Sequence, residues 1–176
     1  MHSLTTGDKL TVRGPIPPYS YKPSTEKERD IVLIAGGAGI TPIYSMTKGI
    51  LSNAADKTRI QLLWGVNGTR DIVLKSELEA LQKQYPERLN ITYAVSGPEA
   101  APEAPIPGPG GLYKKGYVDK KLVEEAFARC RKDSIGDEAK GTKVFLCGPP
   151  KMEDALAGKQ GVLGELGVGK KEIHRF

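Results

Sequence analysis

Two short segments of this chain carry residues whose types and spacing could do chemistry. Residues 31–42 read Ile-Val-Leu-Ile-Ala-Gly-Gly-Ala-Gly-Ile-Thr-Pro, a short apolar run that three glycines interrupt. Residues 147–152 read Cys-Gly-Pro-Pro-Lys-Met and follow a second apolar run. The first segment predicts a buried strand, a tight turn and a helix N-terminus. This arrangement brings bare backbone and unpaired amides together, which is how many proteins bind phosphate groups.

The end of the first segment predicts the start of a helix. Thr41 is suited to the N-cap position because its hydroxyl can accept from an orphan amide, and Pro42 is suited to the first helical position. The glycines alone are a weak signal, because no alignment of Gly36, Gly37 and Gly39 completes the usual dinucleotide fingerprint Gly-x-Gly-x-x-Gly. Counted from Gly37, its third glycine position holds Pro42. A tight turn that binds nothing is therefore an alternative. The second glycine turn, after Cys147, favours a ligand site.

The rest of the chain predicts the elements that position these turns. Apolar runs alternate with helical patterns, and the expected strands cover residues 31–35, 60–64, 89–95, 143–147 and 172–176. This order predicts an α/β fold, a three-layer Rossmann-like doubly wound parallel sheet of about five strands. Ligands of such sheets bind outside the carboxyl ends of the strands. Both glycine turns follow strands, so we expect one site fed by both.

Other segments set the predicted domain organisation. An isolated strand pattern over residues 8–13 is followed by a proline-rich stretch, which divides the chain into a tail and linker (residues 1–30) and a main domain (residues 31–176). Residues 97–116 predict a long Pro- and Gly-rich loop, and residues 131–141 an exposed one. Asp119 is expected to cap a helix with an apolar face of Leu122, Val123, Ala126, Phe127 and Cys130.

Composition excludes several classes of function. The net charge of +5 comes without the basic and aromatic interleaving of a nucleic-acid-binding surface. Cys130 and Cys147 lack metal-ligand spacing, so we expect free thiols and no metal. No apolar run approaches the roughly 20 residues of a membrane helix. These features predict an intracellular domain that does not itself contact a membrane; an anchor at the mitochondrion or endoplasmic reticulum would lie outside this chain.

Together, the two glycine-bearing segments resemble the pyridine-nucleotide domain of the ferredoxin-NADP reductase superfamily, specifically its NADH-cytochrome b5 reductase and nitrate reductase branch. Proline is usual in that branch where the classical fingerprint has its third glycine, and Pro42 stands there. The chain also ends in an aromatic residue, Phe176, as members of this branch do. The resemblance covers residues 4–176, and it is specific because both motifs occur in the family's order.

The resemblance implies how a cofactor would be held. NADH would contact Gly36, Gly37, Ala38, Gly39, Ile40, Thr41 and Pro42 of the first segment, Gly148, Pro149 and Met152 of the second, and the terminal Phe176. Cys147 would lie beside the nicotinamide at the point of hydride transfer, where it would shape and polarise the pocket without acting as a nucleophile. As a residue type alone, Cys147 would more often be a small buried apolar side chain.

Asp71 resembles the acidic residue that, in this branch, faces the adenine ribose and repels a 2′-phosphate. This role implies selection of NADH over NADPH through like-charge repulsion. The alternative for Asp71 is the N-cap of the following helix. Arg70, its neighbour, leaves NADPH open as a ligand.

The resemblance also implies a partner domain. Residues 4–15 resemble the end of the family's flavin domain, whose FAD-binding motifs would lie upstream of Met1. We therefore expect FAD to be held outside this chain, and the isolated chain to be inactive alone. The implied function is transfer of a hydride from NADH to FAD and then of electrons to a haem protein such as cytochrome b5. The alternative is a non-catalytic nucleotide-sensing or interaction module that keeps the fold.

Overall fold

The computed structural model describes residues 5–9, 11, 19–26, 29–97, 112–130 and 142–176. Its strands are β1 (Arg29–Gly36), β2 (Thr58–Val66), β3 (Leu89–Val95), β4 (Leu112–Lys115), β5 (Lys143–Cys147) and β6 (Ile173–Arg175). Its helices are α1 (Ile40–Ser52), α2 (Lys75–Gln84), α3 (Lys120–Arg129), α4 (Pro150–Ala157) and α5 (Val162–Glu165). Three single turns of 3-10 helix, η1 (Gly37–Gly39), η2 (Thr69–Asp71) and η3 (Lys170–Glu172), complete the described elements.

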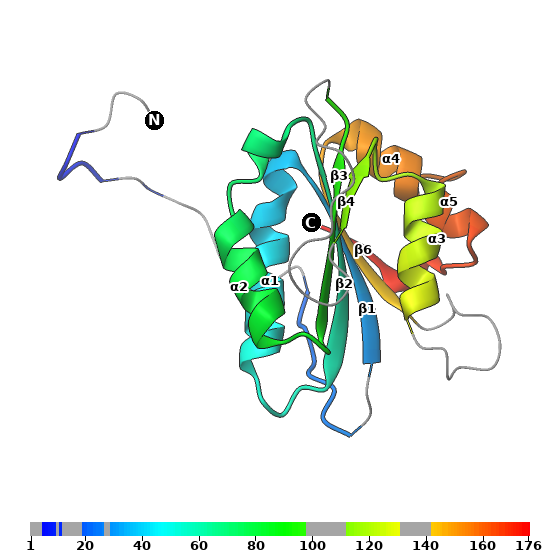
Figure 1. Ribbon diagram of the computed structural model, residues 1–176, viewed down its shortest axis with the longest axis horizontal. Helices are drawn as coiled ribbons and strands as arrows, with labels where there is room; N and C mark the ends of the chain where they lie inside the picture. The colour runs from blue at the N-terminus through cyan, green and yellow to red at the C-terminus, as the bar shows by residue number, and fades with distance from the viewer. Residues whose placement is uncertain (1–4, 10, 12–18, 27–28, 98–111, 131–141) are drawn as a thin grey trace.

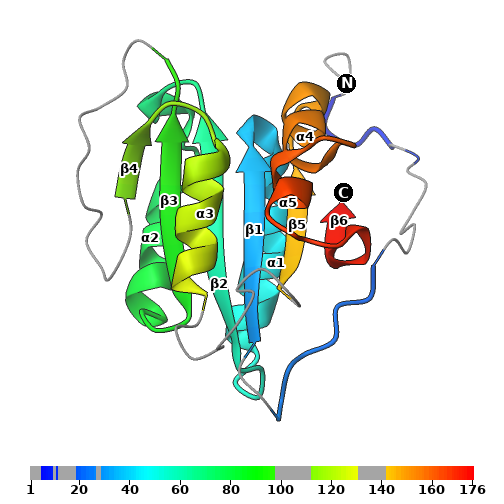
Figure 2. The same cartoon turned by 90° about the vertical axis from the view of Figure 1, so that its right-hand side faces the viewer.

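The sheet lies between two layers of helices. Helices α1 and α2 cover one face, and α3, α4 and α5 cover the other (Figures 1 and 2). Along β1, Ile31 and Leu33 belong to the core on the α1 side, whereas Val32 and Ile34 belong to the core on the α3 side. A strand buried on both faces has no need of polar residues, which explains the unbroken apolar run. The predicted three-layer doubly wound fold is confirmed.

The order of the strands brings the two glycine turns together. The six strands run parallel in the order β4-β3-β2-β1-β5-β6. From β1 the chain builds the sheet outward through β2, β3 and β4, and it then returns to the other side of β1 as β5. The direction of winding therefore reverses between β1 and β5, and Ala35 pairs directly with Cys147 there. Doubly wound sheets bind their ligands at the carboxyl side of such a point.

Two predictions of strands differ from the structure. The prediction of about five strands missed β4, which lies at the end of the segment that was predicted to be a Pro- and Gly-rich loop. Strand β4 is only four residues long and follows a Pro- and Gly-rich stretch, so its sequence shows no strand pattern. The isolated strand predicted over residues 8–13 is not found at Asp8, Lys9 or Thr11; its other positions lie outside the described residues, as do residues 98–111 and 131–141.

Helix boundaries confirm one predicted cap, contradict a second, and exclude the capping alternative for Asp71. Asp119 caps α3 as predicted, and its Oδ1 accepts from the Leu122 amide at 2.9 Å. Thr41 is not the N-cap of α1, because Gly39 takes that position and the helix begins at Ile40. Thr41 instead donates its hydroxyl to the Ala38 carbonyl at 3.1 Å. Asp71 does not cap α2, since that helix has Leu74 at its N-cap.

Residues 19–26, which precede β1, are hydrogen-bonded to the amino-terminal end of the sheet, at the start of β1 and just before β2. The Tyr21 hydroxyl donates to Asp56 Oδ2 at 2.8 Å and accepts from Arg29 Nη2 at 2.6 Å. The Ser24 amide donates to the other oxygen of Asp56 at 3.1 Å. Residues 19–26 thus pack against the main domain, while the predicted division near residue 30 stays a prediction. Within the described part of the chain, no helix is both long and apolar enough to cross a bilayer.

Candidate nucleotide-binding site

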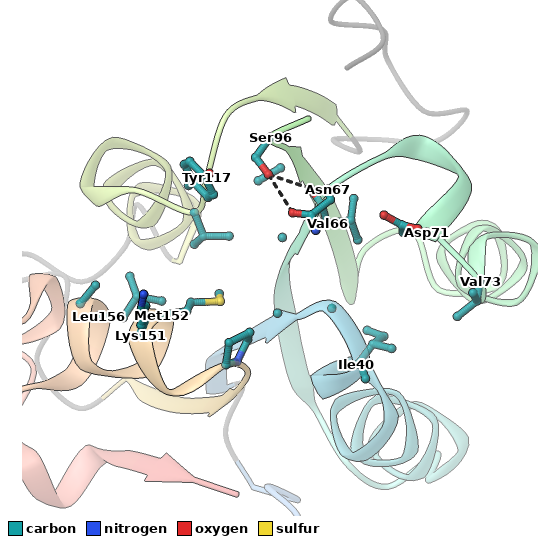
Figure 3. A pocket seen from close by; sticks show the side chains of 18 of the residues that line it. Ile40, Val66, Asn67, Asp71, Val73, Ser96, Tyr117, Lys151, Met152 and Leu156 are labelled. Atoms are coloured by element: carbon teal, nitrogen blue, oxygen red, sulfur yellow. Dashed lines mark hydrogen bonds between the residues drawn. The ribbon is translucent and has the colours of Figure 1, made fainter. Parts of the chain in front are cut away.

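A pocket of about 880 Å³ opens at the carboxyl ends of the central strands. The glycine turn after β1 and the start of α4 both line it (Figure 3). The ends of β2 and β3, which lie on the other side of β1 from β5, contribute Gly65, Val66 and Ala94 to the lining. The pocket therefore lies at the reversal of winding, as the topology predicts.

The first turn exposes backbone to this pocket. Gly37 has a φ of +51°, a left-handed conformation that glycine adopts without the cost of a Cβ. A Cβ at Gly37 would meet nothing within 4 Å, so the peptide faces open space. The Ile40 amide turns back to the Gly37 and Ala38 carbonyls and closes the single 3-10 turn. This leaves a bare cradle at the N-terminus of α1, of the kind that suits a pyrophosphate.

Two glycines allow the first and second turns to touch. A Cβ at Gly39 would collide with the Cys147 carbonyl oxygen, which is backbone and cannot rotate away. A Cβ at Gly36 would collide with the Met152 sulfur and lie 2.8 Å from Pro149 Cδ. The glycines of this segment are therefore required by close packing as well as by turn geometry.

The second turn is held by a side chain of the helix it begins. The Gly148 amide donates to Glu153 Oε1 at 3.1 Å. Pro150 is the first residue of α4, a position where its missing amide hydrogen costs nothing. The turn presents Pro149, Lys151 and Met152 to the pocket. Lys151 is exposed and supplies a positive charge on this side.

Asp71 lies at the far end of the pocket, beside Arg70. The carboxylate accepts from the Gly68 amide at 2.9 Å, which closes the η2 turn. The side chain is also exposed, so one carboxylate both stabilises the turn and faces the pocket (Figure 3). A negative charge at this place repels an added phosphate.

The structure brings most of the sequence-predicted residues to the pocket. Its lining includes Gly36, Gly37, Ala38, Ile40, Thr41, Asp71, Pro149 and Met152. Four others, Gly39, Pro42, Cys147 and Gly148, lie within or beside the two turns but not among the lining residues. Phe176 lies elsewhere, with its ring 6.4 Å from that of Phe145 and 5.1 Å from that of His174.

Sequence reasoning missed part of the lining. The additional residues include Val66, Asn67, Val73, Ser96, Tyr117 and Lys151. Three of them directly follow or end a strand, so the rule that ligands bind at carboxyl ends could have found them. Tyr117 is 77% exposed, and its ring has no role in the core that would explain an aromatic residue there.

Cys147 is a half-buried thiol whose proton is held more tightly than usual. Burial raises the pKa of Cys147, and the nearby Glu153 carboxylate raises it further. The pKa of Cys147 is higher in the folded chain than in the unfolded one. The protonated thiol therefore stabilises the fold fully at any pH below the ordinary thiol pKa. That contribution is lost as the pH rises through the raised value. At neutral pH the side chain is a neutral thiol, a poor nucleophile.

This electrostatic environment predicts slow alkylation of Cys147. We expect iodoacetamide to react slowly at neutral pH and faster only as the pH rises above the ordinary thiol pKa. Glu153→Gln removes the charge and keeps an oxygen for the Gly148 amide, so alkylation should be about two- to fivefold faster. Mass spectrometry of the modified peptide measures both rates. A rate that Glu153→Gln leaves unchanged would show that burial alone controls this thiol.

Comparison with known proteins places this architecture in a family. Residues 33–157 match the oxidoreductase NAD-binding domain family. Among curated proteins, the chain is 36% identical to NADH-cytochrome b5 reductase 2 of Botryotinia fuckeliana, over all of this chain and 49% of that protein. It is 33% identical to the protein of the same name from Aspergillus terreus, over all of this chain and 53% of that protein. The chain thus spans about half the length of the curated relatives it matches.

Solved structures agree with these sequence matches. The cytochrome b5 reductase domain of Ulva prolifera nitrate reductase superposes with a TM-score of 0.75 at 34% identity, over 99% of this chain and 63% of that one. The human Ncb5or structure shares the fold, with a TM-score of 0.63 at 23% identity, over 94% of this chain and 40% of that one. The chain belongs to the oxidoreductase NAD-binding domain family, and the resemblance of its two motifs to the NADH-cytochrome b5 reductase and nitrate reductase branch is confirmed.

Proposed function

We propose that this chain is the NADH-binding half of a flavoprotein reductase. The observation that carries the proposal is the pocket in which the glycine turn after β1 faces the proline-rich turn after β5. Both turns come from the motifs that this family uses for its nucleotide. The pocket is long enough to extend from Asp71 on η2, past the glycine turn, to Lys151 on α4 (Figure 3).

The lining suggests how the parts of NADH would lie. The pyrophosphate would rest on the backbone of Gly37 and Ala38, where the N-terminus of α1 favours an anion by about 0.3 to 2 kcal/mol. The adenine ribose would lie toward Asp71. The nicotinamide would then reach Pro149 and Met152, close to Cys147 at the end of β5. In this arrangement Cys147 acts through its backbone, which packs against Gly39, and its neutral thiol does not act as a nucleophile.

The chemistry would need a flavin held outside these 176 residues. When bound, FAD accepts the hydride of NADH and passes on single electrons. The residues of this chain would orient the nicotinamide and exclude water from it, which are the two contributions that a cofactor reaction takes from a protein. A haem protein is the electron acceptor we propose. The lysine pairs of the surface, such as Lys170 with Lys171, could guide an acidic partner.

A chimera tests hydride transfer. The intact chain would replace the aligned half of the Botryotinia relative, whose other half supplies the flavin domain. We expect the purified chimera to be yellow and to lose its colour when NADH is added without oxygen. NADH that carries deuterium at the transferred position should react more slowly. A chimera that holds FAD and binds NADH but stays oxidised would favour the non-catalytic nucleotide-binding module.

A further inference from the structure

Trp64 is the single tryptophan of this chain, and its indole reaches from the core to the glycine turn. The indole Nε1 donates to the Gly37 carbonyl at 3.0 Å, although the two residues are 27 positions apart. Trp64 is completely buried. A buried donor needs a partner, and here the partner belongs to the wall of the pocket. A phenylalanine would keep an aromatic ring here, but it is smaller than the indole and cannot make this bond.

The position of the indole is fixed by its neighbours in the sheet. Trp64 pairs with Ala35 of β1 on one side and with Tyr93 of β3 on the other. Its ring lies 5.9 Å from that of Tyr93, which in turn stacks on Tyr113 of β4 at 5.1 Å. This aromatic row restricts the rotamers of Trp64. The Nε1 hydrogen therefore points in a fixed direction, toward the carbonyl of Gly37, two residues beyond Ala35.

The bond matters because it ties the turn to the sheet, whereas the bonds from the Ile40 amide and the Thr41 hydroxyl to the Gly37 and Ala38 carbonyls are local to the turn. Gly37 has no side chain, adopts a positive φ and is exposed. Its carbonyl and the Ala38 amide belong to one planar trans peptide, so they point in opposite directions. Holding the carbonyl against the core directs the Ala38 amide away from the core. Gly37 and Ala38 line the pocket on that side.

We propose that Trp64 is a positioning residue that presets the glycine turn for the pyrophosphate of the nucleotide. This inference rests on the proposed function, since it assumes that the turn binds a pyrophosphate. Trp64 touches no ligand itself. It acts through Gly37, by reducing the freedom that the turn would otherwise lose on binding.

The test compares Trp64→Phe with Tyr93→Phe in the intact chain, using ADP-ribose as the probe. Trp64→Phe keeps an aromatic ring but removes the N–H donor. We expect its Kd for ADP-ribose, measured by calorimetry, to rise about three- to tenfold, the effect of one lost hydrogen bond. Tyr93→Phe changes the same aromatic row, but it removes a hydroxyl that has no hydrogen-bond partner in the described structure. Its Kd should stay within about twofold of the unaltered value.

A spectroscopic signature separates positioning from general stability. The single indole N–H gives one cross-peak in a 15N NMR spectrum, and that peak should shift when ADP-ribose reaches the turn. An unaltered affinity in Trp64→Phe, or an equal loss in Tyr93→Phe, would overturn the role of Trp64. An indole peak that does not move at saturation would also overturn it. If the unaltered chain does not bind ADP-ribose, the proposed function itself fails, which is a different result from normal binding by both variants.

Discussion

Replacing Gly39 with alanine is expected to weaken NADH binding at least about tenfold, because the new methyl group separates the two turns that form the pocket. The added Cβ would collide with the Cys147 carbonyl, and the Gly148 amide nitrogen would lie only 3.0 Å away. Both contacts are backbone, so the end of β5 or the start of α1 must move. Overpacking of this kind also lowers the free energy of unfolding by about 1 to 3 kcal/mol.

Gly49 offers a matched control on the same helix. It is exposed in α1, and a Cβ there would meet nothing within 4 Å. Gly49→Ala should therefore stabilise the protein by about 0.5 to 1 kcal/mol, since alanine is the better helix former. Its NADH affinity should equal that of the unaltered chain. Urea unfolding and calorimetry measure the two quantities. Normal NADH binding by Gly39→Ala would contradict the requirement for contact between the turns.

The second large effect is expected at Asp71. Asp71→Asn removes the negative charge but keeps an oxygen that can accept from the Gly68 amide. If the carboxylate repels the 2′-phosphate of NADPH, the ratio of the NADPH Kd to the NADH Kd should fall about tenfold or more in this variant. Arg70, which also lines the pocket, would then meet the phosphate without a competing charge.

Two further variants separate charge from structure. Asp71→Ala removes the acceptor as well, so it should show the same relaxed ratio and lose about 0.5 to 2 kcal/mol of stability. Asp154→Asn removes an equal charge outside the pocket lining, at an exposed pair with Arg175. Its coenzyme ratio should not change. If the ratio of the NADPH Kd to the NADH Kd stays constant in Asp71→Asn, Asp71 does not belong to the site. If that ratio changes in Asp154→Asn, the net charge of the protein controls the choice of coenzyme.

Most of the fold could be predicted because buried strands and amphipathic helices each leave a regular apolar pattern in the sequence. The apolar run of β1 is buried on both faces, and the helical stripe of α3 packs in one core. Such patterns depend on burial, which the sequence displays directly. Strand β4 has half-buried and exposed positions only and follows a Pro- and Gly-rich segment, so no burial pattern marked it. It pairs with β3 at the edge of the sheet, and the sequence does not display that pairing.

Local hydrogen bonds explain the errors at the site. Thr41 and Asp71 both have side chains suited to an N-cap, and in both cases a 3-10 turn comes before the helix. The helices therefore begin at other positions than the capping residues predict. Asp71 uses its capping ability within η2, one turn earlier than the capping alternative required. The sequence shows which residues can cap, but the length of the preceding turn decides which of them do.

Tertiary contacts account for the residues that sequence reasoning missed. Tyr117 and Ser96 stand on loops after β4 and β3, and neither residue type by itself points to a nucleotide. They reach the pocket because the parallel sheet gathers the carboxyl ends of its strands at one edge. The bond from Trp64 to Gly37 likewise depends on the register of β1 with β2.

Titration of the intact chain with NADH tests the central claim most directly. Calorimetry gives the affinity, and amide chemical shifts in a 15N NMR spectrum give the location. We expect a Kd between about 1 μM and 1 mM, with the largest shifts at residues 36–41 and 148–152. ADP-ribose should displace the bound NADH, because the two share the pyrophosphate. Absence of binding, or shifts that avoid both glycine turns, would contradict the account.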